Sequence, residues 1–335
     1  MIVRLANNYV QRGYEVLIGL FDLDDFAYEI DARIKIVDFS TKASNKFLRA
    51  YDHVHKIKKF MKTHPVDVVY AFTISMVPFA IFGKTGRIKV IGAERTNPRM
   101  VKKIYRMIIK LITPLCDGYI FQTQGVKSTY PTKVQKKSAV IGNIAPRILI
   151  EKSEKEEKSV CSVGRLHNDK DFPTLLRSFK RVINVIPDAR LYIYGDGPLR
   201  DELIDLTEEL KIADNVVWKG FSQNVLDEIL KYEVFVFSSK AEGMPNALIE
   251  AMAAGMPCVS TNCEFGPSDL IQHGKNGFLA PIGGDEQMAE YIIRLLSDKI
   301  MRDVIGKAAA EKMKEYSEEV IVRSYLDYTF DVLIK

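Results

Sequence analysis

The sequence predicts an α/β protein made of two doubly wound domains, each built on a parallel β-sheet. With 335 residues the chain exceeds the usual size of one hydrophobic core, which indicates two domains. Short apolar runs of β-branched and aromatic residues alternate with helical patterns, as is typical of parallel sheets covered by helices. Residues 151–159, EKSEKEEKS, are charged and poor in apolar side chains, so we place the domain boundary there.

The predicted elements follow one another in both halves. In the first half the strands fall at residues 14–21, 34–39, 66–72, 89–92, 118–122 and 138–141, and the helices at 2–12, 46–63, 75–82 and 99–113. In the second half the strands fall near residues 159–163, 190–194, 216–218, 233–237, 257–260 and 277–280. We assign residues 1–150 to an N-terminal domain, 159–316 to a C-terminal domain and 317–335 to a terminal helix.

Residues 240–255 join a buried strand to a short helix and carry two glutamates. The apolar run 233–237 predicts the strand, and Pro245 suits the first helical position because its missing N–H costs nothing there. Glu242 then precedes the helix and Glu250 lies within it. Free N–H groups at a helix start favour an anion such as phosphate. Two glutamates beside this helix start suggest a ligand with both hydroxyls and a phosphate. The alternative is that Glu242 is an ordinary loop residue and Glu250 a solvated helix residue.

Four motifs occur together in the second half of the chain. The first is EGMPNALIEAMAAGMPCVST, in which seven residues separate Glu242 from Glu250. The others are VGRLHNDKDF at residues 163–172, YGDGP at 194–198 and GKNGFL at 274–279. Together they resemble the retaining glycosyltransferases of family 4, over roughly residues 118–315. The resemblance implies the GT-B fold, in which two Rossmann-like domains face a cleft and the last helix crosses back to the first domain.

The resemblance places the catalytic residues in the C-terminal domain. It implies that Arg165 and Lys170 hold the donor diphosphate and that Glu242 holds the transferred sugar. Fixed cations stabilise the charge that gathers on a departing nucleoside diphosphate, so no metal is expected. Solvated loop charges are the alternative interpretation of both cations.

Further donor contacts are implied for one helix, one loop and one turn. By resemblance Glu250 accepts hydrogen bonds from the ribose hydroxyls, because the two oxygens of a carboxylate suit a vicinal diol. Glu242 acts together with the backbone of the loop residues Gly243, Met244, Pro245 and Asn246. Gly195 and Gly197 follow a strand and open a helix, where glycine allows the backbone to approach the nucleotide.

Two short motifs in the N-terminal domain could indicate an acceptor site and a metal site. Arg95 and Asn97 follow a predicted strand and would face the cleft, so they are acceptor-side candidates, with ordinary loop positions as the equal alternative. Asp22 and Asp24 imitate the Asp-x-Asp metal site of another glycosyltransferase fold. Further acidic residues beside them favour an ordinary polar loop, so we expect no metal site.

The chain opens with a helix, whereas members of the family usually open with a strand and a glycine-rich turn. Residues 2–13 resemble the helix that follows that turn. We expect the first strand of the N-terminal sheet to be absent, which would leave two neighbouring strands without a shared partner. Because the turn faces the donor phosphates by resemblance, we also expect this chain to bind nucleotide but to transfer sugar poorly.

The two halves differ in charge. Residues 1–150 hold 25 Lys or Arg against 11 Asp or Glu, and residues 151–335 hold 23 against 32.

Residues 99–115 predict a helix with a basic side and an apolar side. It could be a helix that lies on an anionic membrane surface, or an ordinary helix whose basic side faces water. No motif indicates nucleic-acid binding. Nothing resembles a signal peptide or membrane span, so we expect a cytoplasmic protein, free or peripheral on the inner face of the cell membrane.

These features predict a metal-independent retaining hexosyltransferase that needs no cofactor. Its partners are a nucleotide diphosphate sugar as donor and a glycan or lipid-linked glycan as acceptor, in the synthesis of a bacterial surface polysaccharide. A nucleotide-sugar epimerase of the same fold would keep the donor site but lack an acceptor. A catalytically silent nucleotide-sugar-binding protein is the alternative that is not an enzyme.

Overall fold

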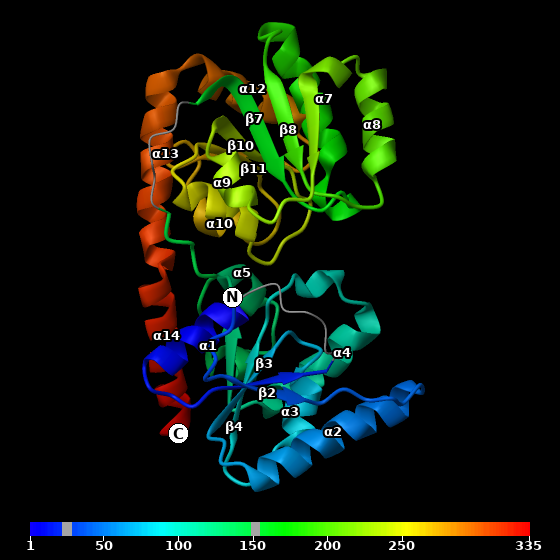
Figure 1. Cartoon of the computed structure of the whole chain (residues 1–335), viewed down its shortest axis with the longest axis vertical. Helices are drawn as coiled ribbons and strands as arrows, with labels where there is room; N and C mark the ends of the chain where they lie inside the picture. Colours follow the sequence, from blue (N-terminus) through cyan, green and yellow to red (C-terminus); the bar gives the residue numbers. More distant parts are fainter. Residues whose placement is uncertain (22–28, 149–154) are drawn as a thin grey trace. The chain divides into compact units, whose positions relative to one another are not determined.

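The computed structural model of the chain describes residues 1–21, 29–148 and 155–335 (Figure 1). Contacts between Cα atoms divide it into two compact units. The first unit comprises Met1–Gly142 with Glu319–Lys335, and the second comprises Asn143–Glu318. Asp22, Asp24 and residues 151–154 of the predicted linker lie outside the described residues.

The first unit ends at Gly142, before residues 151–159, where we placed the domain boundary. Hydrogen bonds explain this difference. The side chain of Asn143 donates to the carbonyl of Met244 at 3.3 Å, and the N–H of Ala145 donates to the carbonyl of Tyr316 at 2.8 Å. The chain is therefore tied to the second unit soon after it leaves the last strand of the first.

The first unit contains parallel strands and the helices around them. Its strands are β1 (Leu17–Leu20), β2 (Lys35–Asp38), β3 (Val68–Phe72), β4 (Lys89–Ala93), β5 (Gly118–Phe121) and β6 (Ser138–Val140). Its helices are α1 (Ile2–Gln11), α2 (Lys46–Thr63), α3 (Val77–Gly83), α4 (Lys103–Ile112), α5 (Gln124–Ser128), α6 (Thr132–Gln135) and α14 (Glu318–Leu333). The helix predicted at 99–113 is interrupted, because ψ is 139° at both Val101 and Lys102.

The strands of the first unit form two sheets that share no hydrogen bonds among the described residues. In one sheet β3, β4, β5 and β6 lie in that order, whereas β1 pairs only with β2. Among the described residues, β1 and β3 thus have one partner strand each and share none, as we expected of two neighbouring strands. The central strands β4 and β5 supply the core, in which Val90, Ile91, Tyr119 and Phe121 are fully buried.

Helix α14 packs on the first unit through buried tyrosines. Tyr325 is fully buried. The hydroxyl of Tyr328 accepts a hydrogen bond from the N–H of Tyr119 at 2.8 Å and donates to the carbonyl of Lys137 at 2.6 Å. Gly118 permits this close approach, because a Cβ there would lie 2.6 Å from the Tyr328 hydroxyl. The terminal helix is therefore anchored on the strands of the first unit.

The second unit is built on one parallel sheet. Its strands are β7 (Glu156–Val163), β8 (Arg190–Tyr194), β9 (Val216–Gly220), β10 (Tyr232–Phe237), β11 (Cys258–Thr261) and β12 (Phe278–Ala280), in the sheet order β12-β11-β10-β7-β8-β9. Its helices are α7 (Phe172–Val185), α8 (Arg200–Glu209), α9 (Val225–Ile229), α10 (Asn246–Ala253), α11 (Pro267–Leu270), α12 (Asp285–Ser297) and α13 (Lys299–Met313).

Alternation along β7 and β10 gives this sheet two apolar faces. Val160 and Val234 belong to the core under α7 and α12, whereas Cys161 and Phe235 belong to the core under α10 and α13. All six residues of β10 are buried, as expected for a strand covered on both faces. Strands β8 and β9 continue on one side of β7 and β10 lies on the other, so the strand order reverses between β7 and β10. Ligands of open α/β sheets bind at the carboxyl ends of strands at such a reversal.

Candidate functional site

Two loops meet at the carboxyl ends of β7 and β10, where the strand order reverses. The N–H of Lys240 donates to the carbonyl of Asp169 at 2.7 Å. The Ser238 hydroxyl donates to the carbonyl of Lys170 at 2.7 Å, and the Oγ atom of Ser239 lies 2.9 Å from the carbonyl oxygen of Asp169. Residues predicted from two separate motifs are thus held together by hydrogen bonds between the loops.

The side chains of Lys170 and Glu242 are in direct contact. The Nζ atom of Lys170 lies 2.5 Å from Oε1 of Glu242, and the Ser239 hydroxyl donates to the same oxygen at 2.6 Å. Only 19% of the lysine side chain and 12% of the glutamate side chain are exposed. The two donors fix the carboxylate in position. An ammonium group has three N–H donors, so Lys170 keeps donors for a second anionic partner.

Arg165 lies in the same loop as Lys170, and it is exposed. Within the described part of the chain its guanidinium has no ion-pair partner. The Nδ1 atom of the neighbouring His167 lies 2.5 Å from Oδ1 of Asp169, and about half of the histidine side chain is exposed. Arg165 therefore has its donors available for an anion, whereas His167 is engaged with a carboxylate of its own loop.

The turn between β8 and α8 requires glycine for steric reasons. A Cβ on Gly195 would lie 1.9 Å from the carbonyl oxygen of Gly164, and a Cβ on Gly197 would lie 2.5 Å from that of Leu166. The φ angle of Gly195 is also +131°. Glycine thus lets this turn close on the loop that carries Arg165. The approach of a nucleotide to the same turn stays a prediction.

Helix α10 begins at Asn246, one residue later than predicted. Pro245 precedes the helix with extended backbone at a ψ of 112°. The loop residues Gly243 and Met244 are buried, and Glu250 is half-buried on the helix. The core-facing residues of α10 are Leu248, Ile249, Ala251 and Met252. The structure thus places Glu250 on the part of α10 that the core leaves uncovered, and its contact with a ribose stays a prediction.

Two neighbours of the loop at residues 242–246 were not assigned to it from the sequence. The side chain of Asn143 donates to Oδ1 of Asn246 at 2.7 Å and to the carbonyl of Met244 at 3.3 Å. A Cβ on Gly266 would lie 2.7 Å from Cδ of Pro245, so glycine lets a further loop pack against this one. Asn143 and Asn246 are 103 positions apart, and no local pattern connects them.

Cys263 lies beside Glu242, and its thiol is buried. Burial raises the pKa of its thiol to about 12, with a further contribution from the negative charge of Glu242. Because the thiolate is the reactive form, a thiol that stays protonated is inert. All four cysteines of the chain are buried and free.

In the first unit, Arg95 and Asn97 have partners that explain their positions. Asn97 is buried, and its Oδ1 accepts a hydrogen bond from the N–H of Arg99 at 2.9 Å at the start of a short 3₁₀ turn, Pro98–Met100. The guanidinium of Arg95 donates to the Tyr325 hydroxyl of α14 at 3.4 Å, and burial lowers its pKa. These contacts are structural, and contact with an acceptor stays a prediction.

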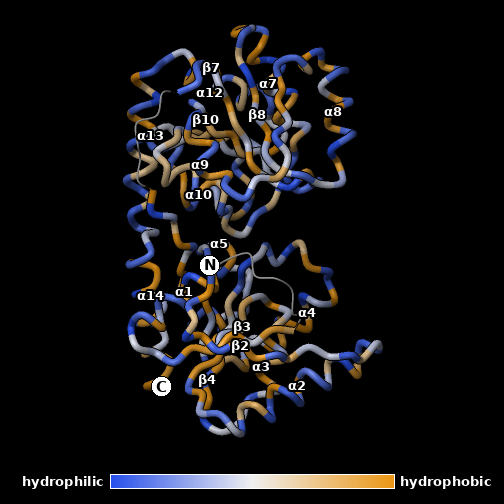
Figure 2. The backbone as a smooth tube through the Cα atoms, viewed as in Figure 1, coloured by the Kyte–Doolittle hydropathy of each residue, from blue (hydrophilic) through white to orange (hydrophobic). Residues whose placement is uncertain are grey.

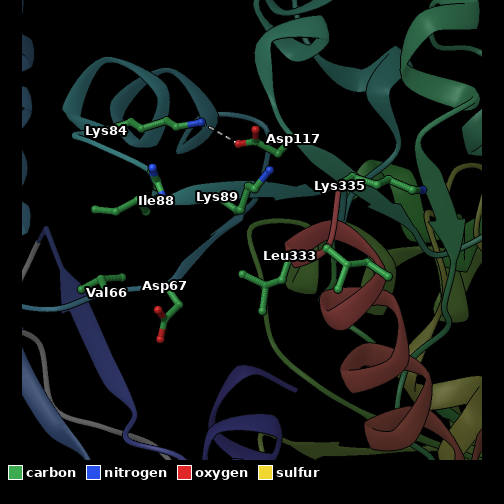
Figure 3. Close-up of a pocket in the computed structure, with 10 residues that line it drawn as sticks. Val66, Asp67, Lys84, Ile88, Lys89, Asp117, Leu333 and Lys335 are labelled. Carbon is green, nitrogen blue, oxygen red and sulfur yellow. Dashed lines mark hydrogen bonds and ion pairs between the residues drawn. The ribbon is translucent and has the colours of Figure 1, made fainter.

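A cavity of about 640 Å³ opens elsewhere in the first unit (Figure 3). It lies at the amino ends of β3, β4 and β5, beside the ion pair in which Nζ of Lys84 is 2.8 Å from Oδ2 of Asp117. Its lining contains none of the predicted site residues. Ligands of open α/β sheets bind at the opposite, carboxyl edge, so we do not assign the candidate site to this cavity.

Comparisons with known proteins agree with the fold. Residues 148–312 match the family described as Glycosyl transferases group 1. An uncharacterized glycosyltransferase of Methanocaldococcus jannaschii is 27% identical, over 89% of this chain and 88% of its own length. A Campylobacter jejuni protein named N-acetylgalactosamine-N,N'-diacetylbacillosaminyl-diphospho-undecaprenol 4-alpha-N-acetylgalactosaminyltransferase is 26% identical, over 94% of this chain and 91% of its length.

A solved structure matches almost the whole chain. HepE of Anabaena, crystallised in complex with UDP, superposes with a TM-score of 0.83 at 19% identity. The match covers 97% of this chain and 94% of HepE. At this identity the likeness concerns the fold, and it confirms the predicted fold class with two Rossmann-like α/β domains.

Proposed function

We propose that the chain, which has the GT-B fold and whose residues 148–312 match the group 1 glycosyl transferases, is a retaining hexosyltransferase. The donor is a nucleotide diphosphate sugar. The acceptor is a glycan or lipid-linked glycan in the synthesis of a bacterial surface polysaccharide, and the transfer needs no metal. The observation that carries the proposal is the contact between Lys170 and Glu242 at the carboxyl ends of β7 and β10.

Two of the similar proteins support the classes of donor and acceptor. The name of the Campylobacter jejuni relative describes a sugar attached to diphospho-undecaprenol, which is a lipid carrier. The HepE structure was solved with UDP bound. We carry over the class of each ligand and leave the sugar and the linkage open.

We assign the donor diphosphate to Arg165 and Lys170. Lys170 would use the N–H donors that Glu242 leaves available, and Arg165 is exposed beside it. Negative charge develops on the nucleoside diphosphate as it leaves, and fixed cations that are shielded from water stabilise this charge. Because the effect is largest in the transition state, loss of either cation should lower turnover more than it lowers donor binding.

Glu242 would bind the hexose as a fixed hydrogen-bond acceptor, together with the backbone of residues 243–246. Its Oε1 already accepts hydrogen bonds from Lys170 and Ser239, and these stabilise the carboxylate anion. A stabilised anion is a poorer nucleophile. We therefore favour attack by the acceptor on the same face as the departing phosphate, without a glycosyl-enzyme intermediate. Glu250 would accept the ribose hydroxyls.

Product analysis tests this proposal. The protein is incubated with nucleotide diphosphate hexoses and a diphospho-undecaprenol-linked glycan, with and without a chelator. We expect release of nucleoside diphosphate in step with glycan formation, the same turnover with chelator, and NMR couplings that show the anomeric configuration of the donor in the product. Inverted configuration would refute retention, and loss of turnover with chelator would refute metal independence.

The two alternatives give different products. An epimerase would isomerise the donor sugar when no acceptor is present. A binding protein would be stabilised thermally by the donor but would release no nucleotide with any acceptor. No observation in the structure favours either alternative.

A further inference from the structure

Helix α4 of the first unit exposes its apolar face to solvent. Apolar residues recur along it at the i, i+3, i+4 and i+7 positions of one stripe. Their exposed fractions run from 43% for Ile108 to 76% for Leu111, and Ile109 is the one buried residue of the helix. We define the α4 stripe as Ile104, Met107, Ile108, Leu111 and the exposed Leu115 in the turn that follows.

This arrangement differs from that of an ordinary doubly wound domain, whose helices turn their apolar side to the sheet. The interpretation in which the apolar side of this helix is buried and only its basic side faces water is therefore wrong. Hydrophobic and hydrophilic segments alternate along α4 (Figure 2). A continuous exposed apolar stripe marks a surface that another molecule covers.

Basic side chains flank the stripe. Residues 95–116 contain six Lys or Arg and no Asp or Glu. Lys103 and Lys110 lie one helical turn before and after Met107, and Arg106 lies on the same side as both. In the part of the chain that the structure describes, none of these three basic residues has an ion-pair partner. The surface thus combines apolar side chains with uncompensated positive charge.

A second exposed apolar group lies at the start of α2 in the same unit. Phe47, Leu48 and Tyr51 are 87%, 62% and 71% exposed, and Lys46 and Arg49 lie among them in the sequence. Helix α3 contacts both α2 and α4, so the three helices belong to one layer of the first unit (Figure 1). The unit therefore offers two apolar and basic groups on neighbouring helices.

The charge distinguishes between the partners that would cover the stripe. If the same stripe of a second copy covered it, the six basic residues of segment 95–116 would face the same six residues of that copy. The segment has no acidic residue to pair with them. Lysine is also depleted from the centres of protein interfaces. An anionic bilayer suits both features, because its acyl region buries apolar side chains and its headgroups attract Lys and Arg. Among the described residues, no helix has the length and apolar character needed to span a bilayer.

We propose that the α4 stripe docks the first unit on a membrane that contains anionic lipid, with the start of α2 as a second anchor. The proposal rests on the proposed function in one respect, because docking brings the enzyme to a lipid-linked acceptor. Membrane binding itself requires neither donor nor acceptor. It can therefore succeed or fail independently of glycosyl transfer.

Sedimentation with vesicles tests the docking. We expect the full chain to bind vesicles of phosphatidylcholine with phosphatidylglycerol and to bind poorly to phosphatidylcholine alone. Binding should weaken as salt rises from about 0.05 M to about 0.5 M, because salt screens the attraction. The double variant Ile108→Glu with Leu111→Glu should lower the partition coefficient at least about tenfold, since it places charge within the buried stripe. The matched control is Ile300→Glu, at an isoleucine of α13 that is 78% exposed, and it should bind as the wild type does.

Thermal unfolding and UDP binding are measured on each variant, and both should match the wild type. Vesicle binding that survives in the double variant, or that is equal on both kinds of vesicle, overturns the docking. A dimer that the double variant dissociates, with no vesicle binding, assigns the stripe to a second copy and also overturns it. Intact vesicle binding without UDP binding or turnover supports the docking and counts against the proposed function alone.

Discussion

The two units share a doubly wound plan but differ in what they leave exposed. In the second unit a single sheet buries apolar side chains on both faces, and Lys170 and Glu242 are paired where its strand order reverses. In the first unit the strands form two sheets, and α4 leaves its apolar stripe in contact with solvent. We infer that the second unit is organised to hold a small anionic ligand and the first to meet an extended surface.

The charges of the two halves follow the same division. Basic residues outnumber acidic ones by 25 to 11 in residues 1–150, whereas acidic residues outnumber basic ones by 32 to 23 in residues 151–335. A site for one diphosphate needs a few cations in fixed positions, and an anionic surface needs many cations spread over it. The predictions below test this division in turn, beginning with the largest expected effect.

Loss of Lys170 should have the largest effect. We expect Lys170→Ala to lower turnover by roughly 10²- to 10³-fold, as is typical when a group that stabilises transition-state charge is removed. The matched control is Lys158→Ala on β7, whose ammonium forms an ion pair with Asp188 in which both side chains are exposed. Turnover measured with saturating donor should change by less than about threefold in the control. Equal losses in both variants would contradict a special role for Lys170.

The next effect is on the stability of the second unit. Gly195→Ala places a Cβ against the Gly164 carbonyl at a φ of +131°, so we expect it to lower the free energy of unfolding by roughly 2–4 kcal/mol. Gly220→Ala is the control, because its φ is also positive but no atom lies within 4 Å of its Cβ. It should cost about 1 kcal/mol, and urea unfolding measures both. If the control lost as much stability, the close contact would not be the cause.

A smaller effect is expected on nucleotide binding. Glu250→Ala should weaken UDP binding by roughly 1–3 kcal/mol, because a hydrogen-bonded carboxylate is lost from the ribose. The control is Glu290→Ala on α12, an exposed glutamate of the same unit. Calorimetric titration should show wild-type affinity in the control, and both variants should keep the wild-type melting temperature. Unchanged affinity in the Glu250 variant would remove this residue from the donor site.

The smallest effect concerns the first unit at acid pH. Burial alone would raise the pKa of Asp117, but hydrogen bonds from Lys84 and from the N–H of Val90 outweigh it and lower the pKa. A group with a lowered folded pKa stabilises the fold above its ordinary pKa of about 3.9, and this contribution is lost as the pH falls further. Because a quarter of each charged side chain is exposed, we expect at most about 1 kcal/mol.

Urea unfolding at pH 7 and pH 3 measures this contribution. Asp117→Asn should be less stable than the wild type at pH 7, and this difference should be smaller at pH 3. Asp67→Asn is the matched control, since this carboxylate lines the same cavity (Figure 3) and has no ion-pair partner among the described residues. The control should change little at either pH. A difference between Asp117→Asn and wild type that does not depend on pH would exclude the ion pair as its source.

The sequence predicts the elements of the site well and their contacts poorly. The apolar run at 233–237 locates β10, and Pro245 locates the start of α10 to within one residue, because these signals are local. Lys170 and Glu242 are 72 positions apart, and they meet because β7 and β10 are neighbours in the sheet. Local apolar patterns do not encode the order of strands, so this pair could not be derived from them.

Helix α4 shows the same limit. Its two-sided pattern is visible in the sequence, and the pattern alone predicts that one side is covered. Which side lies on the protein depends on the residues that the rest of the unit brings to it. In the structure these residues bury Ile109 and leave Ile108 and Leu111 exposed. The sequence alone therefore could not predict that the apolar side of α4 is exposed.

The most direct test of the account is to locate where a nucleoside diphosphate binds. NMR spectra of the backbone amides of the full chain, recorded during titration with UDP, report contact residue by residue. We predict chemical-shift changes centred on residues 164–170 and 240–250 of the second unit. Changes confined to the first-unit cavity around Lys84 and Lys89, or no changes in either loop of the second unit, would contradict the account.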